Sequence, residues 1–271
     1  MNGLEFLYET VPGRLLLKLL CSRRLSAACG WLLDRPVSAG LIEPFRKKYG
    51  IDLSEYERVP YRCFNDFFSR QILAEKRPVD MKETHLIAPC DGLLRVYPIS
   101  RELVFPCKQS VFSVRSLLRS KRLADYYEGG TCLVFRLCVD HYHRYCYVDT
   151  GQKSRNVFIS GVLHTVRPAA LRVRPVFTEN CREYTLIRSK TFGTVLQMEV
   201  GAMLVGRIRN YKEKAFVYRG EEKGMFQYGG STVIVLLPER RLAFEKELEQ
   251  QLENNLEVPV RLGQKIAEAV K

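Results

Sequence analysis

The residues whose types and spacing suggest chemistry most directly are Gly229-Gly230-Ser231-Thr232, which stand immediately before the apolar run Val233–Leu237. Glycine allows a strained or closely approached backbone. A serine hydroxyl that follows it could attack the Gly230 carbonyl, shift the acyl group from nitrogen to oxygen and cut the chain between Gly230 and Ser231. The new N-terminal serine could then become a pyruvoyl group, a carbonyl cofactor made from the protein itself. The simpler alternative is a flexible turn that leads into a buried strand.

Two further segments carry acid and base groups. Asp91 lies in a tight Pro/Gly turn, and the segment Asp140–Cys146 contains His141 and His143, two of the four histidines of the chain. Histidine has a pKa near neutrality, so either ring could deprotonate a serine or carry a proton. On an extended backbone, residues two apart share a face. Taken alone, Asp91 is better explained as an ordinary turn aspartate, and His141 and His143 are better explained as a surface or stacked histidine pair.

The charge of the chain indicates an anionic partner. The net charge is +13, and residues 231–271 carry six Lys/Arg against seven Asp/Glu, so residues 1–230 carry +14. Nucleic acid, an acidic membrane surface and a phosphorylated substrate all fit such a charge. No nucleic-acid recognition motif or basic-aromatic repeat is present, which argues against a nucleic-acid partner.

The cysteines argue against a disulfide framework. There are nine, an odd number, and no two of them form a C-x-x-C pair. This usage favours free, mostly buried thiols in a reducing cytoplasm. Because the cysteines are scattered and lack the close spacing of zinc ligands, we expect no zinc site and no other bound metal.

Two regions are expected along the chain, giving an α+β fold. Residues 1–60 are apolar with basic interruptions, as in Leu15–Leu20 and Ala27–Leu33, and no apolar run is long enough to span a membrane. Short amphipathic helices in a membrane interface would have this pattern, and so would an ordinary helical cap on the domain. Residues 61–271 are expected to form a strand-rich catalytic domain, with a helix over Leu242–Asn254. The predicted strands are Gly92–Tyr97, Cys132–Val139, Val157–Leu163, Glu183–Ile187, Val195–Val205, Ala215–Tyr218 and Thr232–Leu237.

Taken together, these motifs resemble one family, the phosphatidylserine decarboxylase proenzymes, over nearly the whole chain. The resemblance rests on the order and spacing of several weak motifs. They are Phe64-Asn-Asp-Phe-Phe-Ser-Arg70 with Arg77-Pro78, Ala88-Pro-Cys-Asp-Gly92, Asp140-His-Tyr-His-Arg144, Gly161-Val-Leu-His-Thr165, Val200-Gly-Ala-Met-Leu-Val-Gly206, Gly220-Glu-Glu-Lys-Gly224 and Gly229-Gly-Ser-Thr232. The last resembles a variant of the Leu-Gly-Ser-Thr processing motif of the family.

The resemblance implies self-cleavage between Gly230 and Ser231. Ser231 would be the nucleophile and would become the pyruvoyl cofactor at the start of a small subunit, residues 231–271, which stays with the large subunit, residues 1–230, as a heterodimer. The implied reaction is decarboxylation of phosphatidylserine to phosphatidylethanolamine and carbon dioxide, with the pyruvoyl carbonyl as electron sink.

The resemblance also implies roles for the acid and the histidines. Asp91 matches the acid that orients a histidine base, and His143 matches a histidine used in decarboxylation. A second family histidine, the base for the serine, is replaced here by Cys146, and a thiol is a poorer proton acceptor near neutrality. Three substitutes are open: His143 serving both steps, His141 reaching inward, or Cys146 acting as a thiolate. We favour His143, because its neighbours match the family motif.

The expected partners are phosphatidylserine and an anionic membrane, at which the protein would be peripheral on the cytoplasmic side of the cell membrane, with homodimerisation also open. Two other functions remain alternatives at this stage. One is a related pyruvoyl-dependent decarboxylase of a soluble amino acid. The other is a lipid-binding homologue that no longer cleaves itself.

Overall fold

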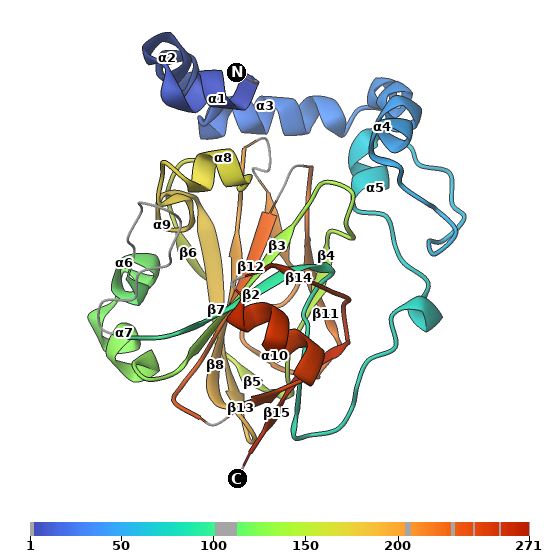
Figure 1. The fold of residues 1–271 in the computed structure, drawn as a ribbon. Coiled ribbons are helices and arrows are strands. Elements are labelled where there is room, and N and C mark those ends of the chain that lie inside the picture. Colours follow the sequence, from blue (N-terminus) through green and yellow to red (C-terminus); the bar gives the residue numbers. More distant parts are fainter. Residues whose placement is uncertain are drawn as a thin grey trace.

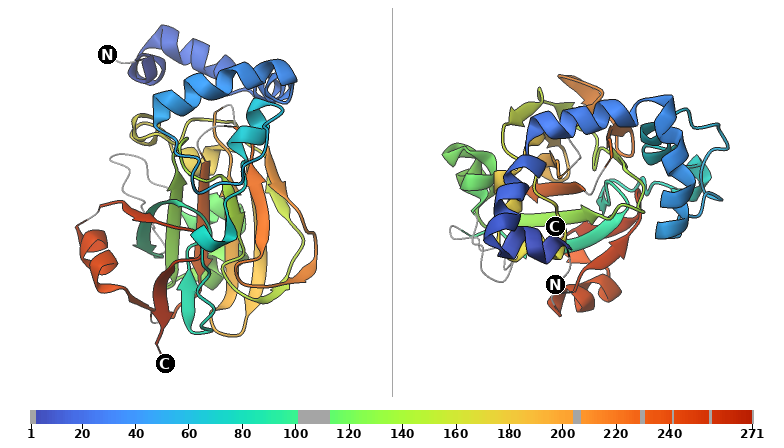
Figure 2. Two further views of the ribbon diagram at one scale, coloured as in Figure 1. Left: turned by 90° about the vertical axis from the view of Figure 1, so that its right-hand side faces the viewer. Right: turned by 90° about the horizontal axis from the view of Figure 1, so that it is seen from above.

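Helices dominate the N-terminal region of the computed structural model, which describes residues 3–100, 113–203, 207–228, 231–240, 242–254 and 256–270. The helices here are α1 (Gly3–Glu9), α2 (Val11–Leu20), α3 (Arg23–Leu33), η1 (Pro36–Leu41) and α4 (Ile42–Tyr49), followed by α5 (Phe64–Phe68) and η2 (Ala74–Lys76). Side chains fix two of the starts: Thr10 accepts the Gly13 N–H at 3.0 Å, and Ser22 accepts the Leu25 N–H at 3.2 Å. All of these helices except η2 form a layer across one end of the strands, whereas η2 lies beside the strands (Figures 1 and 2).

The rest of the chain is mainly antiparallel sheet, so the predicted α+β class is confirmed. The strands are β1 (His85–Ile87), β2 (Gly92–Pro98), β3 (Thr131–Leu137), β4 (Arg144–Cys146), β5 (Gly151–Lys153), β6 (Val157–Ile159), β7 (Arg182–Ser189), β8 (Gly193–Val200), β9 (Ile208–Asn210), β10 (Ala215–Val217), β11 (Glu222–Phe226), β12 (Ser231–Leu237), β13 (Leu242–Phe244), β14 (Val258–Val260) and β15 (Lys265–Ala269). The remaining helices are α6 (Val114–Leu118), α7 (Lys121–Tyr127), α8 (Pro168–Leu171), α9 (Val176–Glu179) and α10 (Lys246–Glu253).

The largest sheet has the order β10-β5-β7-β8-β12-β3-β2-β14, with β6 added beside β7. Strand β12 lies inside it, paired with β8 on one side and with β3 on the other, and every residue of β12 is buried. A continuous apolar run is typical of a strand buried on both faces, and the strand predicted over Thr232–Leu237 agrees with β12 to within one residue.

A second sheet, β4-β11-β9, packs against one face of the large sheet. Gln197 of β8 donates from Nε2 to the Cys146 carbonyl of β4 at 2.9 Å, and Lys223 of β11 is paired with Glu199 of β8. Glu199 lies opposite Val233 in the β8–β12 register, and Ser231 is two residues from Val233 on the same face of β12. The face that carries Ser231 is therefore the face that β4 and β11 cover.

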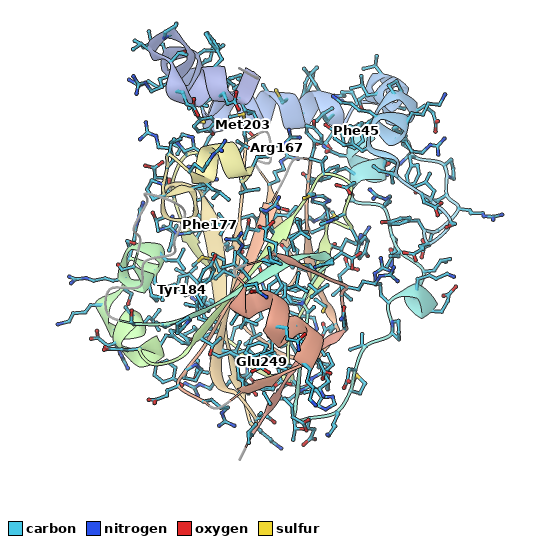
Figure 3. All side chains as sticks on the ribbon, in the orientation of Figure 1. Phe45, Arg167, Phe177, Tyr184, Met203 and Glu249 are labelled. Carbon is cyan, nitrogen blue, oxygen red and sulfur yellow. The ribbon has the colours of Figure 1, made fainter. Side chains whose placement is uncertain are left out.

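The helical layer shares its packing with the sheets. Tyr8, Leu17 and Cys21 belong to the same buried cluster as the strands, while Phe45 of α4 packs on Phe64 of α5 with ring centroids 5.1 Å apart. Figure 3 shows Phe45 at this junction. Within the described ranges, no helix has both the length and the apolar character needed to cross a bilayer.

Three sequence predictions differ from the structure in extent. The helix expected over Leu242–Asn254 begins only at Lys246, because Leu242–Phe244 instead forms β13 and pairs with β15. Strand β8 ends at Val200, and residues 204 and 205 of the predicted Val195–Val205 strand lie outside the described residues. Strand β6 stops at Ile159, since residues 160–163 turn towards the helical layer, where the Leu163 N–H donates to the Cys21 carbonyl.

Gly224 offers a test of how closely β11 and β9 approach. A Cβ atom at this position would lie 2.0 Å from the Arg209 carbonyl oxygen, so Gly224→Ala must displace backbone. We expect a loss of at least about 2 kcal/mol in the free energy of unfolding, measured by urea denaturation. Gly40→Ala, which has open space around its Cβ, is the matched control. Equal stability of the two variants would contradict the close approach.

Candidate functional site

Ser231 is the first residue of β12 and is fully buried. Its Oγ has no hydrogen-bond partner among the described residues, and the neighbouring Thr232 Oγ1 has none either. A buried hydroxyl without a partner costs roughly 1–3 kcal/mol, and a catalytic role is one of the reasons for which a protein retains such a group. Gly229 and Gly230, the other half of the predicted cleavage site, lie outside the described residues.

His143 lies beside the chain that leads to Ser231. The ring is fully buried and packs on Phe68 with centroids 4.1 Å apart, and Phe68 packs in turn on Tyr228 at 5.3 Å. The Nδ1 atom is 2.9 Å from the His141 carbonyl oxygen, which can only accept. Nδ1 therefore carries the proton, and in the neutral ring Nε2 is the basic nitrogen.

Two arginines hold the loop before β4 in place. Arg70 is almost completely buried and donates from Nη2 to the Asp140 carbonyl at 3.0 Å, and Arg144 donates from Nε to the Ser69 carbonyl at 2.8 Å. The Phe64–Arg70 motif thus supplies both the ring that contacts His143 and a cation that fixes the loop carrying it.

Asp91 is engaged by a cation and by backbone. Arg77 donates to both carboxylate oxygens, at 2.9 Å from Nε and 2.7 Å from Nη2, and the Leu262 N–H donates to Oδ1 at 2.8 Å. The described contacts of Asp91 therefore join the turn before β2 to the segment after β14. They do not include a hydrogen bond to His141 or His143.

Cys146 is an unsuitable base where it stands. The residue is buried, and burial raises the pKa of its thiol to about 12. Its backbone is fixed by the Pro89 carbonyl, which accepts its N–H at 2.8 Å, and by Gln197. A thiol with this pKa stays protonated at neutral pH, so the thiolate alternative loses support.

His141 is partly buried, and its Nδ1 accepts the Cys138 N–H at 3.1 Å. Burial lowers the pKa of His141, and the charges of Asp140 and Asp91 oppose that shift. Possible ligand atoms of Cys138, Asp140 and His141 lie within 4.8 Å of one another. Because Arg136 Nη1 is only 3.3 Å from Cys138 Sγ, a cation already occupies one side of this group.

A cavity of about 590 Å³ lies between α3 and the body of the protein, close to the start of β12. Gly201 lines it, and Gly201 follows Val200, which pairs with Thr232. Gln227 and Tyr228, the last described residues before Ser231, line it as well. Asn65 fixes this arrangement: its Nδ2 donates to Asp34 at 2.7 Å, and its Oδ1 accepts the Tyr228 N–H at 3.4 Å.

Sequence reasoning missed the buried charges beneath the site. Lys223 and Glu199 are paired with no exposed surface, and Asn210 links them, with its Oδ1 2.7 Å from Lys223 Nζ. Burial raises the pKa of Glu199 and lowers that of Lys223, and their pairing opposes both shifts. Lys223 belongs to a motif that the sequence singled out, but a lysine is ordinarily exposed, so nothing in the pattern indicated its burial.

The described part of the chain thus combines a buried hydroxyl that lacks a partner there, a histidine with a defined basic nitrogen and an adjoining cavity, which are features of an enzyme active site. Comparison with known proteins identifies the family. The family model described as "Phosphatidylserine decarboxylase" matches residues 64–268. The chain therefore belongs to the phosphatidylserine decarboxylase family.

Curated relatives match almost the whole chain. The chain is 43% identical over 269 residues to "Phosphatidylserine decarboxylase proenzyme 2" of Clostridium acetobutylicum, an alignment that covers 98% of this chain and 92% of the relative. It is 35% identical over 273 residues to "Phosphatidylserine decarboxylase proenzyme" of Clostridium perfringens, covering 97% and 93%. A protein of the same name from Desulfitobacterium hafniense is 35% identical over 269 residues, covering 97% and 90%.

The Lys223–Glu199 pair gives a prediction with a defined pH dependence. Lys223→Met leaves a buried carboxylate without its cation, and we expect a loss of about 3–5 kcal/mol at pH 8. Because burial raises the folded-state pKa of Glu199 above its unfolded value, lowering the pH protonates the folded state first and should restore stability. Urea denaturation at pH 8 and pH 5 measures this difference.

The matched control is the double variant Lys223→Met, Glu199→Gln, which has no buried charge at either position. Its stability should change little between the two pH values. A single variant whose loss is the same at pH 5 as at pH 8 would show that the carboxylate is not the cause.

Proposed function

We propose that this protein decarboxylates phosphatidylserine to phosphatidylethanolamine, using a pyruvoyl group that it makes from Ser231 by self-cleavage after Gly230. The observation that carries the proposal is the position of Ser231 at the start of a central strand, where its buried hydroxyl has no hydrogen-bond partner among the described residues. The family and the names of the relatives support the same reaction.

Self-cleavage requires only groups of this chain and one water molecule. The Ser231 oxygen forms a bond to the Gly230 carbonyl carbon, the bond from that carbon to the Ser231 nitrogen breaks, and the nitrogen receives a proton. Loss of the Ser231 Cα proton then breaks the Cβ–O bond and leaves a carboxylate on Gly230. Hydrolysis of the dehydrated residue releases ammonia and leaves the pyruvoyl group, whose carbonyl supplies an electron sink for decarboxylation.

We propose that His143 is the base that takes the proton from Ser231 and the acid that returns a proton to the substrate carbon. Its Nδ1–H bond to the His141 carbonyl leaves Nε2 to exchange protons. Cys146, with a thiol pKa raised to about 12, is a poor alternative. In this scheme Asp91 acts through its contacts with Arg77 and Leu262, and the contact with Leu262 joins the large subunit to the small one.

We further propose that the helical layer lies on an anionic membrane surface, at the cytoplasmic side of the cell membrane. Exposed apolar side chains of this layer support the proposal, namely Val11, Leu15, Leu16, Leu19, Trp31, Leu32, Val37 and Leu41, which are all about half exposed or more. Surface Lys and Arg would add roughly 1 kcal/mol each near such a membrane. The free cysteines of the described chain suit a reducing compartment.

Ser231→Ala tests the origin of the cofactor. The wild type should give two chains by intact mass, with the smaller one blocked at its N-terminus by pyruvoyl, because only a hydroxyl at position 231 can attack Gly230. Ser231→Ala should remain a single chain and release no carbon dioxide. Cleavage in this variant would exclude Ser231 as the nucleophile. Decarboxylation of free serine but not of phosphatidylserine by the wild type would instead favour the soluble-substrate alternative.

His143→Gln and Cys146→Ser separate the two possible bases. Loss of a general base typically slows a step by about 10²–10⁴-fold, so we expect His143→Gln to slow self-cleavage by at least about 100-fold. Cys146→Ser should cleave at close to the wild-type rate between pH 6 and pH 9, because a thiol with a pKa of about 12 stays protonated throughout. Gel densitometry over time measures both rates. The reverse pattern would assign the proton transfer to Cys146.

A further inference from the structure

The cavity beneath α3 has a wall whose chemistry the proposed reaction does not yet use. Three arginines, Arg23, Arg24 and Arg207, line it against one acid, Glu183. Glu183 is already engaged, since its Oε1 accepts Asn210 Nδ2 at 2.7 Å. The lining therefore carries an excess of positive charge and favours an anionic ligand.

The three arginines differ in what already holds them. Arg23 donates to Ser160 Oγ at 3.3 Å, and Arg207 pairs with Asp34 at 3.1 Å. Arg24 has no acidic partner in the described part of the chain, so its guanidinium is available to a ligand. Guanidinium groups bind phosphate with two parallel hydrogen bonds, which is a stronger and more directional contact than a lysine makes.

A second, independent observation points to the same wall. Ser26 is only 1% exposed and lines the cavity, and its Oγ has no hydrogen-bond partner among the described residues. Ser26 lies one turn after the capped start of α3, near the end where the helix dipole favours a negative charge. The Ser26 side chain, the Arg24 side chain and the first turns of α3 therefore all border the same cavity.

The position of this wall fits one part of the proposed substrate. Gly201, Gln227 and Tyr228 connect the cavity to the start of β12, while α3 also carries Trp31 and Leu32, whose side chains are about half exposed. A serine phospholipid has its phosphodiester between its amino-acid group and its acyl chains. With the amino-acid group at Ser231 and the chains at the outer surface, the phosphodiester falls at α3.

We propose that the first turns of α3 form the binding site for the phosphodiester of a serine phospholipid head group, with Arg24 and Ser26 as its ligands. This site selects a phosphorylated serine over free serine, and it rests on the proposed function for its substrate. The N-terminal helical layer is then part of the substrate site as well as a covering for it.

Head-group binding tests this without depending on catalysis. The probe is glycerophosphoethanolamine, which has the phosphodiester but neither acyl chains nor a carboxylate to lose, titrated calorimetrically into processed enzyme. Arg24→Gln should weaken its binding roughly tenfold to a hundredfold, as expected for loss of a charge-assisted hydrogen bond, and Ser26→Ala several-fold. Lys47→Gln is the matched control, because it removes the same charge from exposed α4 outside the cavity.

Three readings of that experiment are decisive. Equal dissociation constants for Arg24→Gln and Lys47→Gln would overturn the proposal, while self-cleavage and carbon dioxide release by the wild type would show that the proposed function still stands. Binding of inorganic phosphate as tight as that of the diester would make this a site for free phosphate and would overturn the lipid assignment. Normal self-cleavage by Arg24→Gln, with a higher KM for phosphatidylserine in uncharged micelles, would support it.

Discussion

The pairing of β12 on both of its edges is the constraint on which the rest of the structure depends. β3 and β8 hold this strand along its length, and its side chains are buried on both faces. Ser231 is therefore fixed in position and direction by the strand that follows it, whatever happens to the chain before it. A reacting group needs such a rigid base, because small displacements of reacting atoms cost large factors in rate. Everything else in the site is arranged around this fixed point.

Polar groups reach that point from the surrounding elements, and their burial makes the arrangement specific. The small sheet brings Lys223 to Glu199, and the loop before β4 brings His143 against Phe68. A buried charge or ring has few alternative positions, since leaving it without partners is costly in a medium of low polarity. The helical layer closes the same region from above through Asn65, whose amide contacts both Asp34 and Tyr228.

The sequence predicted those parts that depend on local pattern. The apolar run after Ser231 is a strand, and the apolar, basic segments before residue 50 are helices. The sequence was less informative where pairing with a distant strand determines the secondary structure. Leu242–Phe244 has helical spacing, but it forms a strand that pairs with β15. The partner of Asp91 is Arg77, a residue that was noted only as part of a motif. The cavity beneath α3 could not be predicted. Arg24 and Ser26 are residues that any amphipathic helix can contain, and only the packing of α3 on the rest of the protein shows that they line a cavity.

The segment after Ser231 does not form a separate body. Besides β12, it supplies β14, which pairs with β2, and β15, which pairs with β1 and β13. Each of these pairings except the last crosses between residues 1–230 and residues 231–271. If the two pieces were synthesised from separate genes, each would have to carry unpaired strand edges and apolar faces until it met the other, and such surfaces aggregate. Synthesis as one polypeptide avoids this exposure, because the strands on either side of Ser231 can pair as soon as the chain folds, even if the peptide bond before Ser231 is later broken.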